Sequence, residues 1–84
     1  MGKTIKENLV AMPGTLREHF KSGLQYYRKW HRLTQADLAE KSGVNLRMIQ
    51  KYENGEKDIN KAQAITLYKL SQALDCTIED LLEL

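Results

Sequence analysis

Side chains with hydrogen-bond donors recur at helical spacing between residues 46 and 54. Arg47, Gln50, Lys51 and Asn54 stand at positions i, i+3, i+4 and i+7, so one face of a helix would carry all four. Leu46 would lie at the start of the same strip. Guanidinium, ammonium and amide groups in such a row can donate hydrogen bonds to anionic oxygens and to polar acceptors. The spacing therefore predicts a recognition surface on one helix.

The segment before this strip predicts the helix and the turn that position it. Thr34 opens a capping signal, in which a side-chain oxygen accepts from an unpaired backbone N–H at a helix start. The helix expected over 35–42 ends at Gly43, because glycine adopts the left-handed backbone at little cost. Ala39 stands where two closely packed helices leave room only for a methyl group. Asn45 can then cap the helix that carries the strip.

That helix is expected over 46–53 and ends at the Asn54–Gly55 signal. Apolar residues occupy the sides on which the two helices would pack: Leu38, Val44, Ile49 and Tyr52. Burial of these side chains leaves the donor strip on the outside. We therefore interpret the segment from Gln35 to Tyr52 as a helix-turn-helix, whose second helix can enter the major groove of DNA.

Helices are also expected on both sides of this pair. Residues 1–14 are interpreted as a flexible or loosely docked arm. Thr15 with Glu18 predicts a helix start. Residues 15–84 are expected to form one domain. An amphipathic helix from residue 24 to about residue 33 would bury Leu24, Tyr27 and Trp30. Packing in the core is favoured over a stacking platform for single-stranded nucleic acid as the role of Trp30, Tyr27 and Tyr52.

Two helices are expected after the donor strip. The first would run over 61–74, with Asn60 as its cap and a buried stripe made of Ala62, Ile65, Tyr68 or Ala73, Leu70 and Leu74. The second is short, begins at Thr77, and carries the apolar residues Ile78, Leu81 and Leu82. No window alternates between apolar and polar residues as a strand does, so the predicted fold class is all-α.

The charge of the chain is unevenly distributed. The net charge is only +2, but the last ten residues hold four of the 11 acidic residues and none of the 13 basic ones. A basic body with an acidic end is expected when one face meets phosphates, although chance clustering in a short chain remains the alternative. Arg28, Lys29, Arg32 and Lys57 are candidates for flanking phosphate contacts, and solvated charge is the alternative for each.

Several classes of function are not expected from this composition. A chain of 84 residues has room for one hydrophobic core, and no segment reaches the length of about 20 apolar residues that spans a bilayer. Cys76 is the only cysteine, and it forms no metal-ligand pattern with His19 or His31. We expect no enzyme, catalytic residue, metal or cofactor, and a cytoplasmic location.

Three strings in the chain, LTQADLAEKSGVN, IQKYENGEKDIN and TLYKLSQALDCTIEDLL, resemble the Cro/repressor-type helix-turn-helix family, also called the XRE family. The resemblance covers about 60 of the 84 residues and leaves the N-terminal 20 without a counterpart. It implies a five-helix, lambda-repressor-like bundle, preceded here by an N-terminal extension. It also implies binding to double-stranded DNA as a symmetric dimer and regulation of transcription, commonly repression.

The resemblance assigns site residues position by position. It aligns Asn45, Leu46, Arg47, Gln50 and Lys51 with groove-facing positions that contact bases. It makes Gln35 a phosphate contact that often also braces the start of the next helix, and Asn54 and Gly55 part of a loop that touches phosphate. Leu46 departs from the polar base reader of many relatives, and Arg32 replaces a frequent glycine.

Two questions about partners stay open at this level. The apolar C-terminal residues Ile78, Leu81, Leu82 and Leu84 predict a dimer contact, with Leu84 or Leu81 exposed in a monomer. The alternative function is a protein-binding module, such as the antitoxin of a toxin–antitoxin pair, that would neutralise a partner through residues 1–22.

Overall fold

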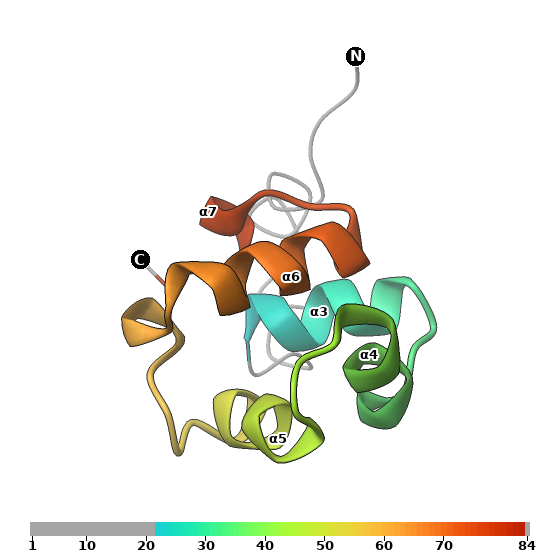
Figure 1. The fold of residues 1–84 in the computed structure, drawn as a ribbon, viewed down its shortest axis with the longest axis horizontal. Coiled ribbons are helices and arrows are strands. Elements are labelled where there is room, and N and C mark those ends of the chain that lie inside the picture. Colours follow the sequence, from blue (N-terminus) through green and yellow to red (C-terminus); the bar gives the residue numbers. More distant parts are fainter. Residues whose placement is uncertain (1–21, 84) are drawn as a thin grey trace, which may run out of the picture.

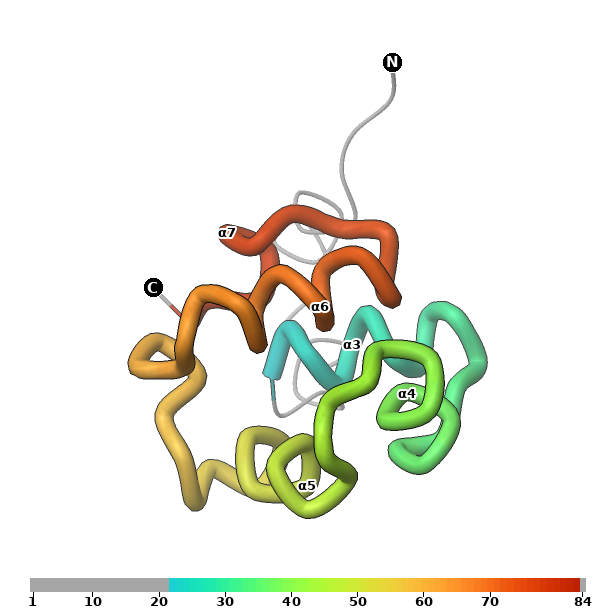
Figure 2. Tube along the Cα trace, viewed as in Figure 1, coloured from blue at the N-terminus to red at the C-terminus, as the bar shows by residue number. Residues whose placement is uncertain are grey.

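Five α-helices and one 3-10 helix make up the computed structural model, which describes residues 22–83 (Figures 1 and 2). In chain order they are α3 (Gly23–Trp30), α4 (Gln35–Ser42), α5 (Leu46–Asn54), η1 (Ile59–Lys61), α6 (Ala64–Leu74) and α7 (Ile78–Leu81). This part of the chain contains no strand, which confirms the predicted all-α class. The predicted arm over 1–14, the helix start at Thr15, and Leu84 lie outside the described residues.

The helix-turn-helix forms as its capping residues predict. The Thr34 hydroxyl accepts from the Asp37 N–H at 3.0 Å, and the Asp37 carboxylate accepts from the Thr34 N–H at 2.9 Å, which completes a capping box. Gly43 ends α4 at φ +77°, and Gly55 ends α5 at φ +78°. A residue with a Cβ is strained in this left-handed region, so glycine ends both helices at the lowest cost.

The core joins all five α-helices. In Figure 1, α3 lies between α6 and α7 on one side and α5 on the other, and α3 contacts both α5 and α7. The four apolar residues predicted to join α4 and α5 are all buried: Leu38, Val44, Ile49 and Tyr52. They belong to one cluster with Leu24, Tyr27, Leu70, Leu74 and Leu81, so the helix-turn-helix stands on the same core as the helices around it.

Trp30 does not lie in the core, and that prediction was wrong. Its side chain is 59% exposed, whereas Tyr26, which was not predicted to be buried, is buried. The two rings stack with their centroids 6.4 Å apart. The reason is that α3 ends at Trp30, three residues earlier than expected, and Arg32 at φ +57° turns the chain away. The predicted burial of Tyr27 and Tyr52 is confirmed.

The segment before α6 also differs from the prediction. Residues 59–61 form η1, which is capped by the Asp58 side chain, and α6 begins only at Ala64. Asn60 caps no helix, because its side-chain amide exchanges two hydrogen bonds with the backbone of Glu83, at 2.8 and 2.9 Å. Of the predicted stripe, Leu70, Leu74 and Ala73, the alternative to Tyr68, are buried, whereas Ile65 and Tyr68 are 54% and 53% exposed.

The C-terminal helix closes the bundle over α3. Thr77 and Asp80 form the capping box of α7, as the Thr77 signal predicts. A Cβ on Gly23 would meet the Asp80 carbonyl oxygen at 2.7 Å, so α3 and α7 approach too closely for any larger residue there. Leu81 is fully buried, so of the two residues predicted to be exposed, Leu84 or Leu81, the second is ruled out, and Leu84 lies outside the described residues. Within residues 22–83, no helix combines the length and apolar character needed to cross a bilayer.

Candidate nucleic-acid interface

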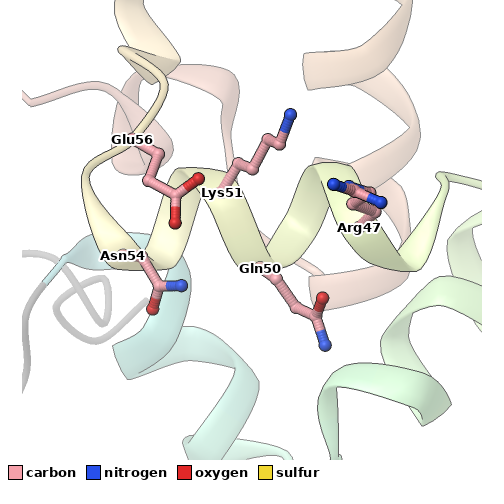
Figure 3. A pocket seen from close by; sticks show the side chains of 5 residues that line it. All are labelled: Arg47, Gln50, Lys51, Asn54 and Glu56. Carbon is pink, nitrogen blue, oxygen red and sulfur yellow. The ribbon is translucent and has the colours of Figure 1, made fainter.

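The two sides of α5 are chemically opposite. Ile49 and Tyr52 on its inner side are buried against α3 and α4. Arg47, Gln50 and Asn54 lie on the outer side and are exposed, and Lys51 is half-buried beside them. Figure 3 shows their side chains projecting from the outer surface of the helix. The structure thus brings the donors of the predicted strip together on one face.

A solvent-facing depression of about 230 Å³ follows this outer face (Figure 3). It is lined by Arg47, Gln50, Lys51, Asn54 and Glu56. Glu56 was not singled out in the sequence, although its place two residues after Asn54 in the turn could have suggested it. Its carboxylate puts one negative charge beside two positive ones, so the face favours an anion at its Arg47 and Lys51 end.

The turn after α5 is fastened to the end of the helix. The Lys51 carbonyl oxygen accepts hydrogen bonds from the backbone N–H groups of Gly55, Glu56 and Lys57, the latter two at 2.9 and 3.2 Å. This folds the turn back against the donor strip. Lys57 is exposed there, so its ammonium group extends the positive side of the interface beyond the helix.

Asn45 and Leu46 form the start of α5. The Asn45 Oδ1 accepts from the backbone N–H groups of Arg47 at 2.8 Å and Met48 at 3.4 Å. Its acceptor is therefore engaged in capping, and its Nδ2 amide is the group it can offer a ligand. Leu46 is an exposed apolar residue in the first turn, next to the polar strip.

Gln35 lies at the first position of α4 and is half-buried. Its Nε2 amide donates to the Glu53 Oε1 carboxylate oxygen at 3.2 Å. The family resemblance implied a brace between this glutamine and the start of α5, but the contact is made near the end of α5 instead. Leu46 at the start of α5 has no polar side-chain atom, which is the physical reason for the difference.

Arg28 is removed from the predicted phosphate contacts by its burial. Only 8% of the residue is exposed, and its guanidinium forms a bidentate ion pair with Glu53, with Nε and Nη2 at 2.7 and 2.9 Å from the carboxylate oxygens. Its Nη1 donates to the Leu33 carbonyl at 2.8 Å. The sequence held one signal for this pair, since Arg28 stands four residues after the buried Leu24 on the same helix face. Lys29 and Arg32, the other candidates near it, are exposed.

Two acidic residues of the C-terminal segment, Glu79 and Asp80, lie on α7, away from α5 (Figure 1). Residues 22–83 carry nine basic and nine acidic side chains, so the net charge of the described part does not explain an attraction to DNA. The arrangement of these charges does favour an attraction to DNA, because α7, with Glu79 and Asp80, is on the opposite side of α3 from α5 (Figure 1). The carboxylates of α7 are therefore held away from the donor strip of α5.

The residues that the structure describes include no group of three that could hold a metal ion. Burial raises the pKa of the Cys76 thiol to about 12, with smaller contributions from the carboxylates of Asp80 and Asp75, so the reactive thiolate is scarce at neutral pH. His31 places its Nε2 2.7 Å from the Leu74 carbonyl oxygen, where it links α3 to α6.

Comparisons with known proteins agree with this geometry. A family model described as Helix-turn-helix matches residues 24–81, which include α4 and α5 and nearly all of the described bundle. No solved structure matches the chain.

Two relatives carry names of the same kind. A protein of Methanocaldococcus jannaschii, named as an uncharacterised HTH-type transcriptional regulator, is 39% identical over 61 residues, which are 73% of this chain and 88% of the relative. A protein of Sinorhizobium fredii with the same type of name is 31% identical over 74 residues, which are 88% of this chain. The chain spans half the length of this second relative. The buried α4–α5 contact, the outward donor strip and the family match agree, and the chain belongs to the XRE-type helix-turn-helix family of DNA-binding regulators.

Proposed function

We propose that this protein is a sequence-specific, double-stranded DNA-binding repressor of transcription, with α5 in the major groove. The observation that carries the proposal is the division of α5 into a buried apolar side and an exposed donor side. A helix of this kind fits the major groove, where base edges present acceptors to side-chain donors. Occupancy of an operator that overlaps a promoter would be sufficient for repression, because the bound protein blocks access to the same DNA.

The base contacts are assigned to the exposed side chains of α5 and its cap. Arg47 can donate two hydrogen bonds to a guanine, and Lys51 can donate to the same acceptors. The Gln50 amide carries both a donor and an acceptor, as pairing with adenine requires. Asn45 acts as a donor only, since its oxygen caps the helix, and Leu46 supplies an apolar contact for a thymine methyl group.

The phosphate contacts are assigned to three residues around the helix-turn-helix. Gln35 lies at the N-terminus of α4, where backbone N–H groups and the helix dipole favour a phosphate. Asn54 and Lys57 flank the turn that is held by the Lys51 carbonyl. These contacts would fix the position of α5 along the groove without reading sequence.

A homodimer on a two-fold operator completes the proposal. Two copies would place their α5 helices in successive major grooves about 34–36 Å apart. The C-terminal region is the proposed contact, through the half-buried Ile78 and Leu82, but without the buried Leu81. We place the protein in the cytoplasm, with the DNA that it would regulate. The antitoxin alternative depends on residues 1–22, of which all but Ser22 lie outside the described part.

Selection of bound sites from random duplex DNA tests this function. The expected result is an enriched two-fold motif with half-sites about 10 base pairs apart. The matched control is the Arg47→Ala/Lys51→Ala protein, which should fold normally and enrich no motif, because both substitutions are on the outer face of α5. Absence of any enriched motif with the unaltered protein would contradict the proposal.

A further inference from the structure

We infer that Glu56 is a specificity-determining residue, whose carboxylate accepts a hydrogen bond from the exocyclic amine of a cytosine in the major groove. This inference rests on the proposed function. Glu56 follows Gly55 in the turn after α5. It is the one acidic residue among the five that line the depression on the outer face of α5, and the other four carry hydrogen-bond donors. The surface proposed to face DNA therefore changes from donors to an acceptor along its length.

The turn after α5 holds the backbone of Glu56 against the donor strip. The Glu56 N–H donates to the Lys51 carbonyl oxygen at 2.9 Å, and Gly55, at φ +78°, bends the chain back toward the helix. In Figure 3 the Glu56 carboxylate points toward α5 and not away from it. The backbone of Glu56 is thus fixed relative to Lys51, while its carboxylate can still contact a ligand on the same face.

The Glu56 carboxylate has no structural role within residues 22–83. Its side chain takes part in no hydrogen bond or ion pair there, whereas Asp37 and Asp80 complete capping boxes. Glu56 is exposed, so water satisfies the carboxylate in the free protein. Contact with DNA removes that water, and a desolvated charge without a partner weakens binding. A DNA group that donates a hydrogen bond to Glu56 would offset this cost.

Cytosine is the base whose major-groove edge fits a carboxylate. Guanine presents only the N7 and O6 acceptors there, and thymine presents the O4 acceptor beside a methyl group, so both would repel the charge. Adenine has an N6 donor, but its N7 acceptor lies next to it. Cytosine presents its N4 amine without a neighbouring acceptor of its own. The acceptor at Glu56 therefore selects cytosine, as the donors of Arg47 select guanine.

The length of α5 separates this contact from the one assigned to Arg47. Arg47 and Asn54 are seven residues apart on the helix, which corresponds to about 10 Å along its axis, and Glu56 follows in the turn. Base pairs along a duplex are about 3.4 Å apart. A helix that lies along the groove would thus place the cytosine about three base pairs from the guanine that Arg47 contacts.

Site selection from random duplex DNA with substituted proteins tests the inference. The unaltered protein should enrich a cytosine in each half-site, at about this distance from the position where Arg47→Ala removes the preference for guanine. Glu56→Ala should lose the preference for cytosine at that position alone, because its backbone bond to the Lys51 carbonyl remains. The matched control, Glu40→Ala, removes an exposed carboxylate from α4 and should leave the motif unchanged. Thermal unfolding verifies that each protein is folded.

Affinities for two duplexes separate a hydrogen bond at Glu56 from simple repulsion of DNA. The first duplex is the selected site, and in the second the C·G pair is replaced by T·A. At one salt concentration, the unaltered protein should bind the second duplex roughly tenfold more weakly, the size of one mismatched base pair. Glu56→Ala should bind the two duplexes within about twofold of each other, because it has no acceptor that distinguishes them. An equal gain in affinity for both duplexes, with the tenfold ratio kept, would overturn the inference.

The outcomes distinguish this inference from the proposed function. An enriched motif that Glu56→Ala leaves unchanged, or one with adenine in place of cytosine at this position, would overturn the role of Glu56 and leave the proposed function standing. Selection of no motif by the unaltered protein would contradict the proposed function and, with it, the role of Glu56.

Discussion

The outer faces of α5 and α6 differ although both helices pack on the same core. The outer face of α5 carries Arg47, Gln50 and Asn54, whereas that of α6 exposes Ile65 and Tyr68. Burial therefore explains one side of each helix and leaves the other free to take any composition. On the proposed function, recognition of DNA depends on the exposed side chains of α5, and the core beneath them determines only their position.

The largest expected effect is on the support beneath α5. Glu53→Gln would leave the Arg28 guanidinium buried without its counter-charge, and we expect a loss of about 3–5 kcal/mol in the free energy of unfolding. Chemical denaturation measures it. The control is Glu56→Gln, which changes an exposed carboxylate three residues after Glu53. It should leave the free energy of unfolding nearly unchanged. A similar, small loss for both substitutions would show that the ion pair does not support the helix.

The two sides of α5 can be compared directly by truncation. Ile49→Ala removes a fully buried side chain and should lower the free energy of unfolding by about 2–5 kcal/mol. Leu46→Ala, on the exposed side of the same helix, should cost far less and should instead reduce preference for thymine at one operator position. Comparable stability losses from the two would contradict the assignment of inner and outer sides.

A smaller effect is expected at the end of α5. Gly55→Ala forces a residue with a Cβ to adopt φ +78°, and we expect a cost of roughly 1 kcal/mol. The space around Gly55 is open, so the cost comes from the backbone alone. Thermal unfolding checks the stability, and a stability equal to that of the unaltered protein would show that the turn after α5 can relax.

The smallest effect is expected on α6. Replacement of both Ile65 and Tyr68 by serine changes exposed side chains, so the free energy of unfolding and the affinity for a single half-site duplex should stay close to those of the unaltered protein. A half-site is used because it requires no second copy. A marked loss of half-site affinity would break the comparison, since it would assign DNA contact to α6 as well.

The same two regions show what could be predicted from the sequence. The bounds of α4 were predicted fully, and those of α5 to within one residue, because strong local signals mark them: a capping box at Thr34 and left-handed glycines at 43 and 55. The start of α6 has no side-chain cap at Gln63. The position of Asn60 predicted a helix cap, but its side chain forms hydrogen bonds with the backbone of the distant Glu83. No local pattern reveals that contact.

Side-chain partners that join distant segments explain the other differences. Arg28 and Glu53 are 25 residues apart, and charge alone suggested a surface position for Arg28. Trp30 fits the apolar spacing of α3, but the helix ends at that residue and leaves the ring outside the core. The donor strip was predictable because helical spacing fixes which residues share a face. The Arg28–Glu53 ion pair beneath the strip was not predictable, because it depends on tertiary contacts.

The central claim is that the outer face of α5 contacts DNA, and one pair of substitutions tests it most directly. Arg47→Ala and Lys69→Ala each remove one exposed cation from a helix, the first from α5 and the second from α6. Affinity for the selected duplex should fall by about 1–3 kcal/mol, roughly tenfold or more, for Arg47→Ala and stay unchanged for Lys69→Ala at the same salt concentration. Equal losses, or no loss for Arg47→Ala, would contradict the account.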